Sequence, residues 1–234
     1  MKTINKIMLH AVFVLLFSYT IAKDLPSGDD TPIALVKKVV KDVTFKESDE
    51  SDWELAKTGV PLQDGQEIKT GNKSLALILF TDGSGLLRVR ENSILHIYGE
   101  KETNKLNKNT FLQKGQLGFQ VSKQEDEQFK FTTPTVVASI RGTGGYIDVE
   151  DDSSTTIVCE TGEIELQATG GEKQSGNLTG GNSANINSNG QININQSTDD
   201  EKNELNKNKQ TETKVIKIKT ENGEIEIEYL PEGN

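Results

Sequence analysis

The sequence predicts an all-β protein, a β-solenoid-like stack of short strands that ends in a C-terminal β-hairpin, with a β-sandwich as the alternative. Three observations predict this class. Hydrophobic residues make up only 33% of the chain and aromatic residues 6%, which suits a narrow core. From Ile33 onward, short apolar runs alternate with turn signals at intervals of about ten residues. No long helical pattern interrupts them.

Residues 1–22 have the form of a signal peptide. Lys2 and Lys6 precede an apolar stretch that ends at Ile21, and Ala22 offers a small residue for cleavage. The apolar run is shorter than the ~20 residues that a membrane-spanning helix needs, so cleavage is favoured over an uncleaved N-terminal membrane anchor. We therefore expect a periplasmic or secreted protein.

The composition excludes several classes of function. Removing residues 1–22 takes two lysines and moves the formal net charge from -10 to -12, which would repel nucleic acid. Cys159 and His96 are the only cysteine and histidine of the processed chain, so an intrachain disulfide and a multi-histidine metal site are excluded. We predict no metal, no cofactor and no small-molecule substrate.

Changes in composition predict the organisation of the processed chain. Residues 23–32 are rich in proline and aspartate and predict a flexible leader. Residues 33–195 carry the strand pattern. Residues 196–213 are polar, with Leu205 as their one large apolar side chain, and predict a linker or a frayed helix. Residues 214–230 predict a β-hairpin.

Side-chain alternation places several strands. The valines between Leu35 and Phe45 favour a strand over a helix, because β-branched side chains lose rotamer freedom in a helix. The run from Ser74 to Thr81 is apolar on both faces and predicts a central, buried strand. Arg88 and Arg90 alternate with apolar neighbours and predict a solvated face.

Two Asn-Gly pairs predict hairpin turns. Around Asn189-Gly190, a three-residue loop of residues 188–190 places Ile186 opposite Ile192, which a two-residue loop does not. Around Asn222-Gly223, a two-residue turn places Ile218 opposite Ile227 and Ile216 opposite Tyr229. An isolated hairpin is marginal in water, so we predict an interaction surface on its apolar face, formed by Ile216, Ile218, Ile227 and Tyr229.

Other candidate sites have simpler structural explanations. Arg141-Gly142-Thr143 lacks the helix of a phosphate-binding loop and predicts a tight turn. The carboxylates Asp148, Glu150, Asp151 and Asp152 lack the spacing of a calcium loop and predict a solvated strand end. Glu163 and Glu165 follow strand alternation, Cys159 fits a small core residue, and His96 alternates along a strand without a nucleophile motif. We predict no catalytic residue.

An ordered set of short motifs resembles the FecR-domain family of envelope proteins over residues 35–195. The matching segments are Trp53 with Leu55, residues 58–62, Gly65 with residues 68–71, the run from Ser74 to Ile97, residues 112–117, Phe131-Thr132-Thr133-Pro134, Arg141-Gly142-Thr143 and Thr161-Gly162-Glu163-Ile164. The sequence departs from the family pattern where Gly144-Gly145 precede Tyr146 and where Gln66 replaces a common aspartate.

The resemblance implies a solenoid-like β-fold and a regulatory role in the envelope. The best known members relay the state of an outer-membrane receptor to a sigma factor, through a cytoplasmic segment that precedes a membrane helix. Only six residues precede the apolar run here, so we do not expect that segment or direct sigma-factor control.

We therefore expect a non-enzymatic, exported FecR-domain protein that binds an unidentified envelope protein. The alternative is a structural or glycan-binding surface protein, in which Tyr98 or Tyr146 would stack on cell-wall glycan. A hydrolase ranks last, because it needs convergent carboxylates or a histidine-assisted nucleophile.

Overall fold

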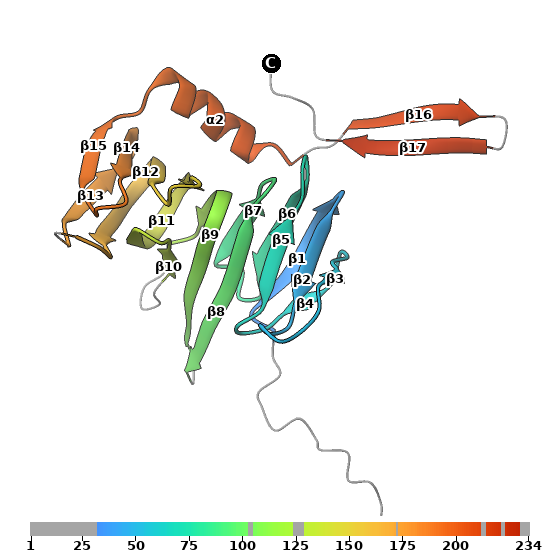
Figure 1. Cartoon of the computed structure of the whole chain (residues 1–234), viewed down its shortest axis with the longest axis horizontal. Helices are drawn as coiled ribbons and strands as arrows, with labels where there is room; N and C mark the ends of the chain where they lie inside the picture. Colours follow the sequence, from blue (N-terminus) through green and yellow to red (C-terminus); the bar gives the residue numbers. More distant parts are fainter. Residues whose placement is uncertain are drawn as a thin grey trace, which may run out of the picture. The chain divides into compact units, whose positions relative to one another are not determined.

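The computed structural model describes residues 32–102, 105–123, 129–171, 173–211, 214–220 and 223–229. The predicted signal peptide and nearly all of the predicted leader lie outside these residues. Within them, no helix is both long and apolar enough to cross a membrane. One large, mostly antiparallel sheet, one α-helix and a separate two-stranded sheet make up the described structure (Figure 1). The prediction of an all-β protein with a C-terminal hairpin is confirmed.

The large sheet folds into two layers, because three of its strands are long enough to contribute to both. Layer A has the strand order β3-β2-β5-β8-β9-β10-β11-β12-β13 and layer B has the order β4-β1-β6-β7-β9-β11-β12-β14-β15. In both layers the strands follow the chain order after the first two positions, as in a solenoid, but neighbours are mostly antiparallel, as in a sandwich.

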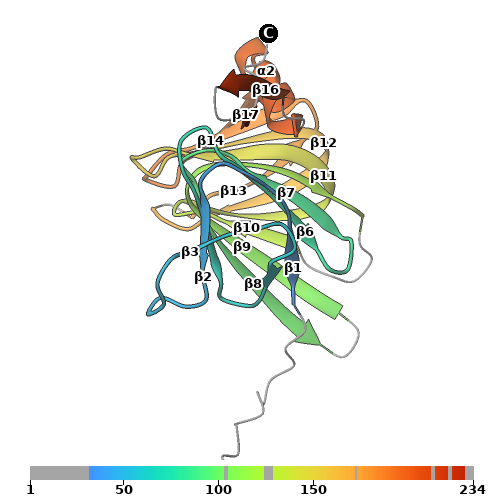
Figure 2. The same cartoon turned by 90° about the vertical axis from the view of Figure 1, so that its right-hand side faces the viewer.

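The strand bounds are as follows. Layer A contains β2 (Val43–Lys46), β3 (Glu54–Leu55), β5 (Glu67–Thr70), β8 (Ile94–Glu102), β10 (Phe129–Thr132) and β13 (Ser175–Thr179). Layer B contains β1 (Ala34–Val40), β4 (Pro61–Leu62), β6 (Leu75–Phe80), β7 (Gly85–Val89), β14 (Asn182–Ile186) and β15 (Ile192–Gln196). The shared strands are β9 (Lys105–Val121), β11 (Val136–Val149) and β12 (Thr155–Ala168), and Figure 2 shows the strong curvature of β11 and β12.

Each shared strand changes layer at a glycine with a positive φ. Gly115 in β9 has φ +84°, Gly142 in β11 has φ +67° and Gly162 in β12 has φ +84°. Residues before and after each glycine pair with strands of different layers. Arg141-Gly142-Thr143 is therefore an irregularity inside a long strand, and the prediction of a tight turn there is wrong.

The core lies between the layers. Phe119 of layer B packs against Phe131 of layer A with ring centroids 5.0 Å apart, and Phe80 packs edge-on against Phe129 at 5.0 Å. Strand β6 is central and buried, as predicted, because its second face meets a small outer cluster of Val40, Leu75 and Leu77.

A helix covers part of the outer face of layer B. α2 (Asp199–Lys209) begins at Thr198, whose side chain accepts a hydrogen bond from the Glu201 backbone while the Glu201 carboxylate bonds back to the Thr198 N–H. This reciprocal cap satisfies the first helical turn. Leu205 packs on Tyr146 and Val158. A regular, docked helix thus replaces the predicted linker or frayed helix, because one leucine is enough when the sheet supplies the rest of the apolar contact.

Both hairpins form, but only one register is as predicted. Ile186 pairs with Ile192 and Ala184 with Ile194, and Gly190 has φ +78°, so the three-residue loop is confirmed. In the C-terminal hairpin, β16 (Lys214–Thr220) and β17 (Gly223–Tyr229) pair with Ile216 opposite Ile227.

The predicted register of the C-terminal hairpin is therefore wrong by two residues. A shift of two residues keeps every side chain on the same face. The pattern of apolar and charged residues therefore does not discriminate between the two registers. In the observed register Lys217 lies opposite Glu226 and Lys219 opposite Glu224.

We expect Gly162→Ala to unfold more easily than a matched control. Its positive φ is unfavourable for alanine, and a Cβ would lie 2.8 Å from the Gly142 carbonyl oxygen. We predict a loss of about 3 kcal/mol in the free energy of unfolding. Gly83 has φ +72°, but a Cβ added there would have no atom within 4 Å, so Gly83→Ala should lose only about 1 kcal/mol. Urea unfolding measures both, and equal losses would contradict a steric role for the layer change.

Candidate functional site

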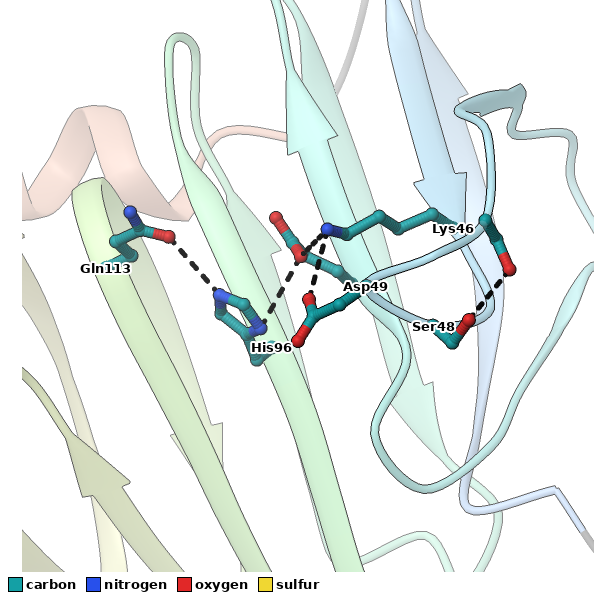
Figure 3. Close-up of polar contacts among 7 residues, drawn as sticks. Lys46, Ser48, Asp49, His96 and Gln113 are labelled. Carbon is teal, nitrogen blue, oxygen red and sulfur yellow. Dashed lines mark hydrogen bonds and ion pairs between the residues drawn. The ribbon is translucent and has the colours of Figure 1, made fainter.

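A row of side chains crosses the outer face of layer A. Cross-strand pairing places Lys46 of β2 beside Glu67 of β5, Glu67 beside His96 of β8, and His96 beside Phe111 of β9. Because residues in direct register on adjacent strands point to the same face, these side chains meet although they are far apart in sequence. Figure 3 shows the polar part of this row.

Glu67 is the centre of the row. Its carboxylate oxygen lies 2.9 Å from Lys46 Nζ and 3.6 Å from His96 Nδ1, and its side chain is only 6% exposed. Lys46 also approaches Asp49 at 3.2 Å. The hydrogen bond to Glu67 raises the pKa of Lys46, with Asp49 adding to the effect and desolvation opposing it. The row therefore holds its charges in compensated pairs.

The contacts of His96 do not form a nucleophile–base pair. Its Nε2 lies 3.3 Å from Gln113 Oε1 and its Nδ1 lies 3.6 Å from the Glu67 carboxylate, so both ring nitrogens face side chains other than hydroxyls. The nearby hydroxyls of Ser48 and Ser51 are 2.9 Å apart and bond to each other. A histidine-assisted nucleophile would need a hydroxyl at Nε2. The contacts in this row therefore fix the positions of side chains and do not activate a nucleophile.

Aromatic side chains lie on the same face. The Trp53 ring is 38% exposed and has Lys46 Nζ at 5.2 Å and Lys69 Nζ at 5.4 Å from its centroid. Tyr98, also 38% exposed, is parallel to His96 with centroids 6.3 Å apart. We call Trp53, His96, Tyr98 and Phe111 the aromatic face. Rings held by packing and cation–π contact lose little entropy on binding.

A groove adjoins Tyr98. Its volume is about 550 Å³, and its lining includes Asp64, Asn109 and Lys130 beside the tyrosine. Asp64 accepts a hydrogen bond from the Gly99 N–H at 2.9 Å. The groove therefore combines one exposed ring with charged and amide groups.

The predicted interaction surface is only partly within the described side chains. Ile216 is 48% exposed and its neighbour Val215 is 51% exposed. The side chains of Ile218, Ile227 and Tyr229 lie outside the described ones, so their predicted role remains a prediction.

The structure agrees with the structural explanations predicted for Cys159, Glu163 and Glu165. Cys159 is buried and free, and burial together with Glu160 raises the pKa of its thiol to about 11, which keeps it protonated and unreactive. Glu163 and Glu165 are exposed and alternate with buried residues. Within the described part of the chain, no group of three or more metal-ligating side chains converges.

Two predictions of solvated side chains are wrong. Asp148 lies half-buried, accepts a hydrogen bond from Gln116 Nε2 at 3.1 Å, and has its pKa raised to about 6, chiefly by burial. Arg88 and Arg90 are also half-buried, and desolvation lowers the pKa of both. All three lie on the outer face of layer B, where α2 approaches the sheet.

Reasoning from the sequence missed the aromatic face. Alternation along each strand places Lys46, Glu67 and His96 on outward faces, but only the strand order brings the three together. The one available signal was Trp53, the single tryptophan of the chain.

Asp148 should make the stability of the protein depend on pH. Its folded-state pKa of about 6 lies above the ordinary 3.8, so the unfolded chain loses this proton at lower pH than the folded one. Stability should therefore fall as the pH rises from about 4 to 6 and stay lower above that window. Asp148→Asn, which keeps an acceptor for Gln116, should remove this fall.

Urea unfolding across this range tests the expectation. Asp148→Asn should be more stable than the wild type at neutral pH, and the difference should shrink as the pH approaches 4. Asp151→Asn, a change at an exposed neighbour, is the control and should leave the profile unchanged. If Asp148→Asn raises the free energy of unfolding by the same amount at every pH, ionisation of Asp148 is not the cause of the gain.

Comparison with known proteins finds a family match in the central segment. Residues 66–165, from the turn before β5 into β12, match the family model described as FecR protein, a shorter segment than the one from which the resemblance was inferred. Two crystal structures of a candidate anti-sigma factor from Parabacteroides distasonis match with a TM-score of 0.48 and 16% identity, over 56% of this chain and 59% of theirs. The chain thus spans about three fifths of those proteins. No curated protein matches. The resemblance to the FecR-domain family is confirmed over residues 66–165.

Proposed function

We propose that this protein is a non-enzymatic FecR-domain module that regulates or assembles envelope components by binding another protein. The observation that carries the proposal is the distribution of exposed large apolar side chains. One such place is the C-terminal hairpin, where Val215 and Ile216 are exposed. Another is the edge strand β3, where Leu55 and the preceding residue Trp53 are exposed.

The hairpin needs a partner surface. It forms a sheet of its own and does not pair with the large sheet. Two strands alone are marginal in water, and Ile216, on the apolar face of the hairpin, leaves about half of its surface exposed. Burial of this apolar surface against another protein would stabilise both the hairpin and the complex.

The aromatic face offers a second contact area on the FecR domain. Tryptophan and tyrosine are the residue types that most often dominate binding energy at protein interfaces. The contacts of Glu67 with Lys46 and His96 hold together the strands that carry these aromatic side chains. The bond of His96 to Gln113 supports binding rather than catalysis as the role of this face.

The place of action is also part of the proposal. The signal-like residues 1–22 support export, with the described domain acting in the periplasm or outside the cell. An uncleaved anchor would keep the same domain at the membrane surface.

Photo-crosslinking in the native cell envelope tests the hairpin. A photoreactive phenylalanine analogue at Ile216 should capture a specific partner, whereas the same analogue at exposed Gln167 on β12 should not. In a separate affinity pull-down without crosslinker, a tagged chain that lacks residues 214–234 should no longer capture that partner, while its circular dichroism remains that of a β-protein. Undiminished capture by the truncated chain would reject the role of the hairpin.

Glycan binding is a second candidate, supported by the groove beside Tyr98. A sugar ring can stack on an aromatic face while amide and carboxylate groups bond its hydroxyls. Asp64, Asn109 and Lys130 would supply those bonds. Tyr146, the other tyrosine proposed from the sequence, is only 3% exposed because Val158 and Leu205 pack on it, so that part of the hypothesis is wrong.

A peptidoglycan pull-down separates the two candidates. If the groove binds glycan, Tyr98→Ala should reduce the bound fraction several-fold, because the stacking surface is lost. Ile216→Ala should leave glycan binding intact and serves as the control. Wild-type protein that stays in the supernatant would eliminate the glycan candidate without affecting the crosslinking result.

A further inference from the structure

A second cavity lies on the opposite layer, at the C-terminal end of α2. Its volume is about 470 Å³. It is bounded by strands β7, β9, β11 and β12 and by the last turn of the helix. The side chains that matter below come from Arg88, Glu160, Asn208 and Lys209, with Gly118 and Gly144 in its wall.

Arg88 lacks a counter-charge within the part of the chain that the structure describes. It lies on β7 between Leu77 of β6 and Gly118 of β9. Among the described residues it makes no ion pair, and its Nε is buried without a hydrogen-bond partner. Desolvation alone lowers its pKa. Placing a guanidinium partly out of water without a partner is costly, so this residue is prepared for an anion that the chain itself does not provide.

The neighbouring arginine shows the difference. Arg90 donates a hydrogen bond to the Gln210 carbonyl at 3.3 Å and is attracted by Glu204 and Glu91. Its contacts explain why it lies beneath the end of α2. No such contacts explain Arg88, although the two are only two residues apart on the same face.

Asn208, which lines the same cavity, has an unused acceptor. The residue is 1% exposed. Its Nδ2 donates to Gln116 Oε1 at 2.9 Å and to the Glu204 carbonyl at 3.1 Å, which fixes the orientation of the amide. Its Oδ1 is then buried without a donor. Leaving a buried acceptor unsatisfied costs free energy, so a ligand that brings an N–H or O–H group would be favoured.

Glycines and a closed ion pair shape the remaining wall. Gly118 is the cross-strand neighbour of Arg88 and has no side chain, which leaves room for Asn208 to pack there. Lys209 pairs with Glu160 at the margin, which leaves Arg88 as the uncompensated charge. One uncompensated guanidinium can neutralise a single anionic charge, so a carboxylate suits this site better than a multiply charged anion such as phosphate.

We propose that this cavity binds a small organic acid whose carboxylate is adjacent to an N–H or O–H donor, such as a hydroxy acid or the carboxyl end of a peptide. The carboxylate would bond the Arg88 guanidinium, whose planar fork matches it. The adjacent donor would bond Asn208 Oδ1. This site stands whether or not the hairpin binds a partner protein.

Titrations followed by amide NMR test the site with four probes. Glycolate carries a carboxylate and a hydroxyl, N-acetylglycine carries a carboxylate and an amide N–H, acetate lacks the donor, and inorganic phosphate is the multiply charged anion. Glycolate or N-acetylglycine should shift the amide signals of Gly118, Gly144 and Asn208. The better of the two should bind about five-fold more tightly than acetate, as expected for one hydrogen bond. Which of them is better distinguishes a free acid from a peptide end.

Variants tie the response to Arg88. Arg88→Gln should weaken binding at least about ten-fold, the effect of losing a charge-assisted contact, while the remaining amide signals show that the fold is kept. Lys114→Gln removes an exposed positive charge from the other part of β9 and should leave binding unchanged. The proposal fails if no probe shifts these signals at tens of millimolar, if Arg88→Gln responds like the wild type, or if phosphate or acetate binds as well as the donor-bearing acids.

Discussion

The layer change at three glycines is the constraint on which the rest of the structure depends. Gly115, Gly142 and Gly162 each have a positive φ where a long strand leaves one layer and enters the other. Their surroundings leave little room, since a Cβ on Gly115 would lie 2.3 Å from Ser93 Oγ. Three of the short motifs that resemble the FecR family contain these glycines. The family pattern therefore marks the points where the chain changes layer, which explains why it predicts the fold better than it predicts a site.

The outer faces of the two layers have different environments, because α2 covers one of them. Its side chains contact Ser183 on β14, Glu160 on β12 and Gln116 on β9. Charged groups beneath or beside the helix are consequently desolvated, as the raised pKa of Asp148 indicates. The outer face of layer A has no such covering helix among the described residues, so its aromatic side chains remain available to a partner.

The sequence predicts local structure well where competing arrangements differ in which side chains meet. Around Gly190 the candidate loops differ by one residue and only one matches Ile186 with Ile192, so the register could be predicted. In the C-terminal hairpin the alternatives differ by two residues, which leaves Ile216 and Ile218 on the same face in both. Solvation could not be predicted in this way. Arg88 looks solvated along its own strand, and only the docking of a distant, polar helix changes its environment.

Consecutive residues at the end of α2 line the cavity and bond to layer B. Asn208 and Lys209 line the cavity, and the next two residues are held by long-range bonds, Gln210 by Arg90 and Thr211 by Lys38 Nζ at 3.3 Å. The hairpin begins three residues after Thr211. A ligand that bonds Arg88 and Asn208 would add a contact between the sheet and the last helical turn, and would therefore oppose fraying of the helix end.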